Sequence, residues 1–194
     1  MTDENITKLG PLAALVGTWE GGSGADVAPD DRAETDRETR NSKYRERLVL
    51  EPIGRVDNHE QVLYGLEYFT MAWREGAPED QPFHQENGYW LWDAANNQVL
   101  RCFIVPRGLT VLAGGTVEPD AKEWSIAADA GSETYGICSN KFLIEEFKTV
   151  RYELKITVHE DGSFSYFEDT QLAMKGREEL FHHTDQNHLR RVSP

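Results

Sequence analysis

Val150-Arg151-Tyr152-Glu153-Leu154-Lys155-Ile156-Thr157-Val158 alternates apolar and polar residues over nine positions. Successive side chains of a β-strand point to opposite faces of the sheet, so this stretch predicts a strand with one buried face and one wet face. The dipeptide Asp161-Gly162, a strong hairpin signal, follows it. The chain then runs back from Phe164 to Leu172, which completes a predicted β-hairpin.

Further strands are predicted on both sides of this hairpin. They cover 44–50, 62–73, 83–92, 98–105, 109–117, 123–128 and 179–192. Short turns join several of them, for example at Asp93 to Asn97 and at Pro119-Asp120. The glycine-rich stretch 17–24 predicts a sharply curved first strand, because glycine permits tight bends and close backbone approach. The short apolar stretch 8–16 before it predicts one brief helix at the end of the sheet.

These elements predict an all-β protein with nine or ten strands. No interval between strands holds a long amphipathic helix, and parallel strands would need such crossovers, so we expect an antiparallel sheet. A sheet of this many hairpin-linked strands curls into a barrel or splits into a sandwich. A barrel of this size has room for one ligand. We expect one domain over 1–194, with a loose tail at 1–7 and an acidic, solvated loop at 27–42.

The composition favours a globular protein in the cytoplasm. The chain has 194 residues, of which 39% are hydrophobic and 28% charged. Its acidic N-terminus is unlike a signal peptide, so we expect Cys102 and Cys138 to be free thiols. No stretch approaches the roughly 20 apolar residues of a membrane-spanning helix. A net charge of −14 argues against nucleic acids and anionic membranes as partners.

Three of the six histidines lie near the C-terminus, at His182, His183 and His188. Along a continuous strand His182 and His188 are roughly 20 Å apart, so they cannot share one zinc ion. His183 and Asp185 lie on one face of the strand, but the residues themselves name no further ligand. A single inward histidine would be enough to hold a haem iron. Equally, each of these histidines could be a surface residue or be hydrogen-bonded.

Two N-terminal segments carry a resemblance to a known family. Gly17-Thr18-Trp19-Glu20-Gly21 resembles the GxWxGxG signature of the nitrobindin family, with Ser23 in place of the third glycine. The segment Phe83-His84-Gln85-Glu86-Asn87-Gly88-Tyr89 is similar to that family's H-x-E-x-G-Y segment. Residues 107–111 resemble the hairpin that follows it. The structural signature therefore comprises Gly17, Trp19, Gly21, His84, Glu86, Gly88 and Tyr89.

The C-terminal strand completes the resemblance, which covers about 9–192. Asn187-His188-Leu189-Arg190 resembles the family's H-L motif, whose histidine binds haem. The run His183-Thr184-Asp185-x-Asn187 is similar to a bacterial subgroup of fatty-acid-binding-like barrels. The acidic segment 27–42 is longer than the family's usual connection.

The resemblance implies one antiparallel β-barrel of ten strands, shaped like fatty-acid-binding proteins and lipocalins. It implies ferric haem b with His188 as the ligand of the iron. It also implies nitric oxide binding and, as an enzyme activity, isomerisation of peroxynitrite to nitrate. No catalytic acid or base can be named. A non-catalytic carrier of a fatty acid or another small apolar molecule is the alternative, and a barrel filled by its own side chains is a third.

Two signature residues also have structural interpretations. Trp19 is expected to plug the closed end of the barrel, with Arg190 or Arg191 stacked on its ring. His84 is expected to join Glu86 and Tyr89 in a polar network at one barrel end. The residues specify no oligomeric state.

Overall fold

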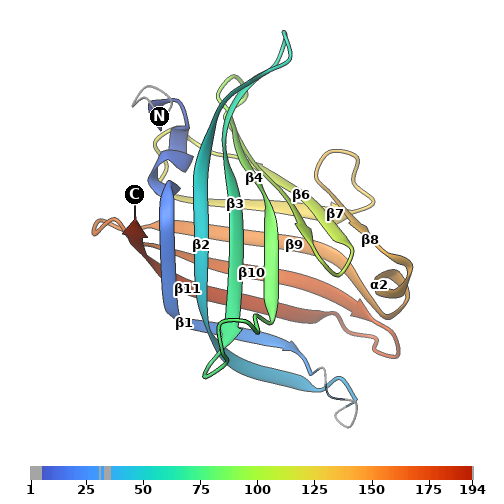
Figure 1. Cartoon of the computed structure of the whole chain (residues 1–194). Helices are drawn as coiled ribbons and strands as arrows, with labels where there is room; N and C mark the ends of the chain where they lie inside the picture. Colours follow the sequence, from blue (N-terminus) through green and yellow to red (C-terminus); the bar gives the residue numbers. More distant parts are fainter. Residues whose placement is uncertain (1–5, 31, 33–35, 194) are drawn as a thin grey trace.

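The computed structural model describes residues 6–30, 32 and 36–193, and they form a closed β-barrel (Figure 1). A short 3₁₀-helix, η1, precedes the barrel, and a short α-helix, α2, connects β8 to β9. The elements are η1 (Gly10–Leu15), β1 (Gly17–Pro29), β2 (Thr39–Asp57), β3 (Val62–Arg74), β4 (His84–Asp93), β5 (Gln98–Val105), β6 (Leu109–Thr116), β7 (Glu123–Ala130), β8 (Gly136–Ser139), α2 (Lys141–Glu146), β9 (Phe147–Val158), β10 (Phe164–Met174) and β11 (Phe181–Ser193).

The strands follow one another around the barrel in the order β1-β11-β10-β9-β7-β8-β6-β5-β4-β3-β2, and β2 closes on β1. The prediction of an all-β barrel of about ten strands is confirmed, and the sandwich is excluded. The pairing is not purely antiparallel, because the short strand β8 runs parallel to β7. β8 inserts where β6 and β7 separate, since these two strands pair only at Gly114 and Ala127.

The first and last strands pair with each other. Glycine is needed on β1 because inner side chains lie directly on its backbone. A Cβ atom on Gly21 would lie 2.6 Å from the amide nitrogen of Asn187, and one on Gly24 would lie 2.5 Å from the ring of Tyr44. The register of β1 shifts between Gly21 and Gly24, which marks the bend.

The η1 end of the barrel is closed by an apolar cluster around Trp19. Leu12 and Leu15 of η1 are buried there. The indole N–H of Trp19 donates to the carbonyl of Leu15 at 2.8 Å, and the ring of Phe164 meets Trp19 edge to face at 4.8 Å. The guanidinium of Arg191 lies 4.7 Å from the centre of the Trp19 ring. Burial of this tryptophan therefore ties η1 to both β1 and β11.

The chain between β1 and β2 differs from the expected acidic loop. Residues 27–29 continue β1 and 39–42 belong to β2, with Ala28 paired to Arg40. Backbone hydrogen bonds extend this hairpin although its side chains are polar, which the hydrophobic pattern could not reveal. Residues 31 and 33–35 of the expected loop, and 1–5 of the expected tail, lie outside the described part of the chain.

The elements β8 and α2 were not predicted, because four and six residues are too few to show a periodic pattern. Asn140 caps α2, since its side chain accepts a hydrogen bond from the Leu143 N–H. Glu146 at the end of α2 receives hydrogen bonds from Arg37 and Lys175.

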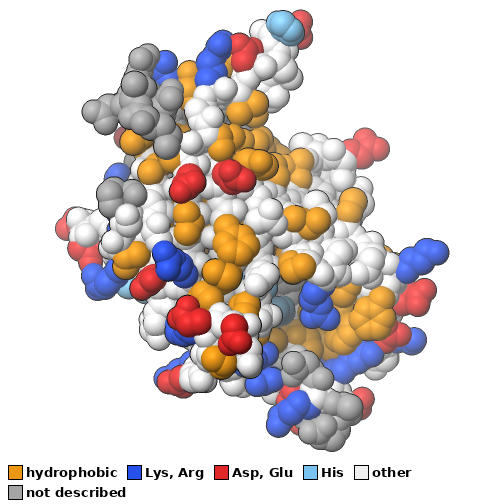
Figure 2. Space-filling model, viewed as in Figure 1, with side chains coloured by type: hydrophobic (Ala, Val, Ile, Leu, Met, Phe, Trp, Pro, Cys, Tyr) orange, Lys and Arg blue, Asp and Glu red, His pale blue; other side chains and the backbone are white. Residues whose placement is uncertain are grey.

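The outer surface mixes acidic, basic and apolar side chains, and the β2–β3 hairpin projects beyond the barrel (Figures 1 and 2). Cys102 and Cys138 are free. None of the helices in the described part of the chain is both long and apolar enough to cross a membrane.

Replacing Trp19 with alanine should lower the free energy of unfolding by about 3–5 kcal/mol, because the large side chain at the centre of the closed end is lost. Phe142→Ala is the matched control, since Phe142 is 56% exposed on α2. It should change stability by less than about 0.5 kcal/mol. Urea unfolding followed by circular dichroism measures both values. Equal effects of the two substitutions would contradict the closed-end packing.

Candidate functional site

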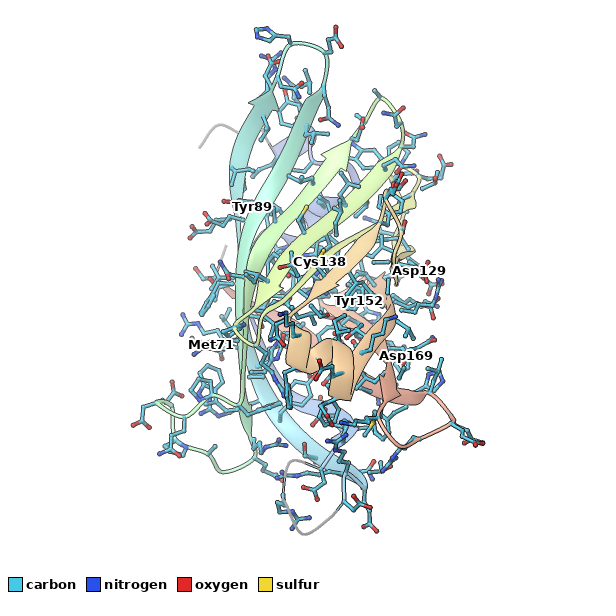
Figure 3. The ribbon with its side chains drawn as sticks, turned by 90° about the vertical axis from the view of Figure 1, so that its right-hand side faces the viewer. Met71, Tyr89, Asp129, Cys138, Tyr152 and Asp169 are labelled. Carbon is cyan, nitrogen blue, oxygen red and sulfur yellow. The ribbon has the colours of Figure 1, made fainter. Side chains whose placement is uncertain are left out.

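A buried arginine, Arg101, lies in the barrel interior. Arg101 of β5 donates from Nε to the Tyr68 hydroxyl at 3.1 Å and from Nη2 to Glu86. Its Nη1 donates to the Tyr152 hydroxyl and to Glu168, the latter at 3.1 Å. Tyr152 lies inside the barrel in side view (Figure 3). One cation therefore holds side chains from β3, β4, β9 and β10.

Arg101 and Glu86 form an ion pair in the barrel interior. Burial by itself raises the pKa of the Glu86 carboxyl, but the charge of Arg101, together with His84 and the Tyr68 hydrogen bond, lowers the pKa overall. Four aromatic rings also surround the guanidinium, with centres 4.6–5.8 Å away; they belong to Tyr68, Trp90, Phe103 and Tyr152. Removing either charge would leave the other one buried without its partner.

A second buried carboxyl, that of Glu46 on β2, is held by neutral donors. Thr70 donates to it at 2.9 Å, Tyr166 at 2.8 Å and Asn187 at 3.1 Å. The hydroxyls of Tyr166 and Tyr44 are 2.7 Å apart and continue the network. Within the described residues, no cation pairs with Glu46. Burial therefore raises the pKa of Glu46, although the three hydrogen bonds oppose this shift.

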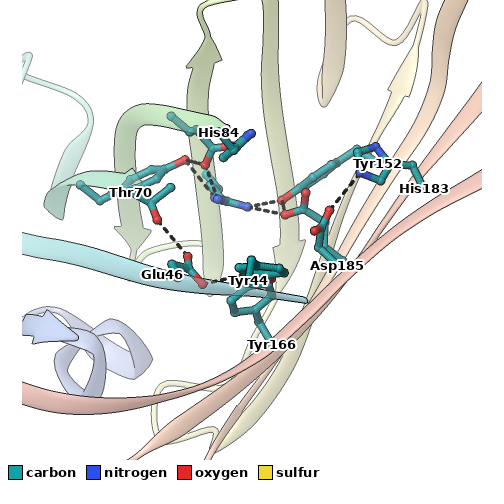
Figure 4. A network of polar contacts seen from close by, with 12 residues as sticks. Tyr44, Glu46, Thr70, His84, Tyr152, Tyr166, His183 and Asp185 are labelled. Carbon is teal, nitrogen blue, oxygen red and sulfur yellow. Dashed lines mark hydrogen bonds and ion pairs between the residues drawn. The ribbon is translucent and has the colours of Figure 1, made fainter. Parts of the chain in front are cut away.

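A third cluster lies at the end of the barrel opposite η1, which we call the open half. His183 of β11 places Nε2 3.1 Å from Oδ1 of Asp26 and 3.3 Å from Oδ2 of Asp185 (Figure 4). Asp26 is almost fully buried, and Ser42 donates to its Oδ2 at 2.8 Å. The guanidinium of Arg74 is 3.7 Å from the same oxygen.

The carboxyls in the third cluster differ in their pKa values. For Asp26, burial raises the pKa, but hydrogen bonds from His183 and Ser42 lower it overall. For Asp185, burial and the negative charges of Glu168 and Asp26 raise the pKa to about 7 against the opposing effect of His183. Burial lowers the pKa of His183, and the neighbouring carboxylates more than reverse this. The cluster is thus short of positive charge.

The ligand-type atoms of Asp26, His183 and Asp185 all lie within 4.8 Å of one another. Sequence reasoning had grouped His183 with Asp185 on one strand face and found no further partner. The third member comes from β1, 157 residues away in the chain. No local pattern could have revealed it.

His84 faces the interior at the start of β4. Its Nε2 is 3.8 Å from Oε2 of Glu86. Burial lowers the pKa of His84, but Glu86, with the more distant charges of Glu168 and Asp185, raises it overall. Tyr89 does not join the expected network. Side chains alternate between the two faces of β4, so Tyr89 lies on the outer face, where it is 43% exposed. Gly88 is needed because a Cβ there would collide with the carbonyl of Cys102.

The structure places His188 on the outer face of the barrel. Its neighbours Asn187 and Leu189 are buried, and strand alternation turns His188 the other way. Its Nδ1 is 3.0 Å from the hydroxyl of Ser165, and its ring centre is 5.2 Å from that of His159.

His182 also lies on the outer face, where it is exposed and pairs with Asp169 at 2.7 Å. Of the three C-terminal histidines, only His183 faces the interior.

The closed barrel agrees with the comparison of the sequence with known families. Residues 8–191 match the sequence model of the family described as THAP4-like, heme-binding beta-barrel domain. The chain belongs to this family. The match covers nearly all of the chain, and it confirms the predicted resemblance to nitrobindin-like barrels.

Among solved structures, the THAP4-like chain is similar to the one titled "Crystal Structure of Rv2717c from M. tuberculosis". The two are 20% identical, with a TM-score of 0.64, and the alignment covers 95% of this chain and 96% of the other. This likeness shows the barrel fold. A search of curated proteins gave no significant match.

Several interior residues of this family member escaped sequence reasoning. Arg101, Glu46, Tyr68, Tyr152 and Glu168 belong to no local motif. The sequence holds one usable indication of the role of Arg101. It alternates in step with Val99 and Phe103, so its side chain is on the buried face of β5. A charged residue on the apolar face of a strand indicates either an error in the assignment or a paired charge.

Arg101→Met should lower the free energy of unfolding by about 3–5 kcal/mol, because it leaves Glu86 charged and unpaired in the interior. The double variant Arg101→Met/Glu86→Gln should regain a large part of this loss, since Glu86 no longer carries a buried, unpaired charge. Urea unfolding at neutral pH compares the two. A double variant no more stable than the single one would contradict the ion pair.

Glu46→Gln should change how stability depends on pH. Since the folded pKa of Glu46 is raised, its protonated form favours the folded state, and this contribution is lost as pH rises through the folded value. Each unit of pKa displacement is worth about 1.4 kcal/mol. The wild type should therefore lose more stability than Glu46→Gln between acidic and alkaline pH in urea unfolding. Glu118→Gln, at an exposed position, should follow the wild type; parallel profiles for all three would contradict the assignment.

Proposed function

We propose that the barrel binds ferric haem b at its open half, with His183 rather than His188 as the axial ligand. The observation that carries this proposal is the inward orientation of His183, combined with its hydrogen bond to the buried carboxylate of Asp26. Membership of a heme-binding family supports haem in general. From the outer face, His188 could hold iron only outside the barrel.

The donor set at His183 fits a haem ligand. Neutral imidazole is a common axial ligand, and a ligating histidine usually has its other ring nitrogen bonded to a carboxylate or a carbonyl. Here Nε2 bonds Asp26, which Ser42 holds in turn. No described residue hydrogen-bonds Nδ1 of His183, so this atom is left for the iron. Asp26 would fix the ring orientation and raise the basicity of the ligand.

Apolar side chains near His183 fit the flat faces of a porphyrin. Phe181 precedes His183 by two positions on the same face of β11. It packs with Leu172 and Met174 of β10, and Phe147 lies against this group. Such a cluster supplies the apolar surroundings that a haem needs beside its ligand.

The polar network would form the floor of this site. Arg101, Glu86 and Tyr152 lie between the open half and the apolar cluster at η1, so a ligand entering from the open half would stop at them. A ferric haem, when bound, supplies an iron coordination position for nitric oxide or peroxynitrite, as the family resemblance implies. The chain's part is to hold the axial imidazole, orient it through Asp26 and keep the remaining interior filled.

A fatty-acid carrier is the less favoured candidate. Its ligand's carboxylate would need a free cation inside the barrel. Arg101 already bonds described residues through Nε, Nη1 and Nη2. The interior carboxylates Glu46, Glu86 and Glu168 would repel a second anion.

Haem titration of the purified protein tests the ligand. The wild type should shift the Soret band on binding ferric haem, and His183→Ala should weaken binding by at least about tenfold, because the direct iron ligand is lost. His188→Ala should bind like the wild type. His182→Ala is a matched control, since His182 is on the outer face of the same strand. Loss of binding in His188→Ala alone would overturn the assignment.

Asp26→Asn tests the orienting role separately. It should weaken haem binding by about 10–100-fold without abolishing the Soret shift, because the imidazole remains but loses its carboxylate. Circular dichroism of the apo-variant checks that the barrel is intact. No haem uptake by the wild type, together with co-purified lipid in native mass spectrometry, would instead support the carrier.

A further inference from the structure

The outer faces of β2 to β6 carry a patch of apolar side chains, which we call the apolar wall. It comprises Val49, Phe69, Tyr89, Cys102, Ile104 and Leu112. Phe69 is 40% exposed, Tyr89 43% and Ile104 48%. Tyr89 and, farther along the sheet, Met71 can be found on this side of the barrel in Figure 3.

Strand register and diagonal contacts connect the apolar wall. Val49 pairs with Phe69, and Tyr89 pairs with Cys102, which pairs with Leu112. Between β3 and β4, Asn87 lies opposite Phe69 and Glu67 lies opposite Tyr89, so the two aromatic side chains meet diagonally. Side chains directly opposite each other on neighbouring strands lie about 4.5–5.5 Å apart at Cβ. Scattered exposed apolar residues need no explanation, but a contiguous patch on one face indicates an interaction surface.

The charges at the edge of the apolar wall indicate what covers it. Glu51 and Glu67 stand opposite each other on β2 and β3, and like charges in this arrangement are destabilising. Arg47 lies on the same outer face of β2, four residues before Glu51. Within the described part of the chain, none of these three side chains makes an ion pair. Along a strand Arg47 and Glu51 are about 13 Å apart, too far to pair in one chain.

We propose that the apolar wall binds a second copy of this chain, face to face. A two-fold axis crossing the strands at the level of Phe69 places the two Phe69 side chains together. The same operation brings Arg47 of each copy opposite the Glu51–Glu67 pair of the other. The surface is therefore self-complementary, as an isologous dimer requires. His183 is inside the barrel, so this inference does not depend on haem binding.

Sedimentation velocity of the full chain over a concentration series tests the proposal. The wild type should shift from monomer to dimer as concentration rises. Phe69→Glu should raise the dissociation constant by at least about thirtyfold, because it buries a charge at the centre of the contact. Phe142→Glu, on exposed α2, should leave the constant unchanged. Circular dichroism checks the fold, and Ile104→Lys repeats the test at a second wall position.

Charge reversal gives the sharper result. Arg47→Glu should weaken association by about tenfold, because it faces two glutamates of the other copy. Adding Glu51→Arg to the same chain should restore most of the affinity, since the exchanged charges meet only between copies. A protein that stays monomeric at every concentration would overturn the proposal. So would a dissociation constant unaffected by both wall variants, or a double variant no tighter than Arg47→Glu.

Discussion

The interior of this barrel depends on the pairing of Arg101 with Glu86. A guanidinium and a carboxylate cannot be buried unless they are paired and their remaining donors and acceptors are satisfied. Tyr68, Tyr152 and Glu168 meet that requirement from three other strands. The network therefore favours one register of β3, β4, β5, β9 and β10, since a slip by one residue would turn these side chains outward.

The same network divides the barrel into two halves with different tasks. The half near η1 is packed around Trp19 and has a structural role. The open half holds the side chains that can do chemistry. Their properties result from incomplete charge compensation, because the carboxyl groups outnumber the histidine between them. Asp26 and Asp185 share one histidine, so His183 is held firmly on its Nε2 side. Charge compensation is also incomplete on the outer surface beside the apolar wall, where Glu51 and Glu67 have no cation partner among the described residues.

The barrel could be predicted from the sequence, and the site only in part. Strand alternation is a local signal, so the hairpin at Asp161-Gly162 could be predicted. Elements as short as β8 and α2 could not. The histidine-rich strand was recognised, but motif similarity selected His188, while strand phase turns His183 inward. The contact between Asp26 and His183 is made by closure of the barrel, which no sequence window contains.

The central claim is that the iron binds inside the barrel at His183. It is tested most directly by nuclear magnetic resonance of the ferric haem complex, since the unpaired electrons of the iron relax nearby nuclei. The methyl signal of Met174, which packs with Phe181 at the open half, should be strongly broadened or shifted. The ring signals of His159, which lies beside His188 on the outer face, should remain sharp. The reverse pattern, with His159 broadened and Met174 unaffected, would contradict the account.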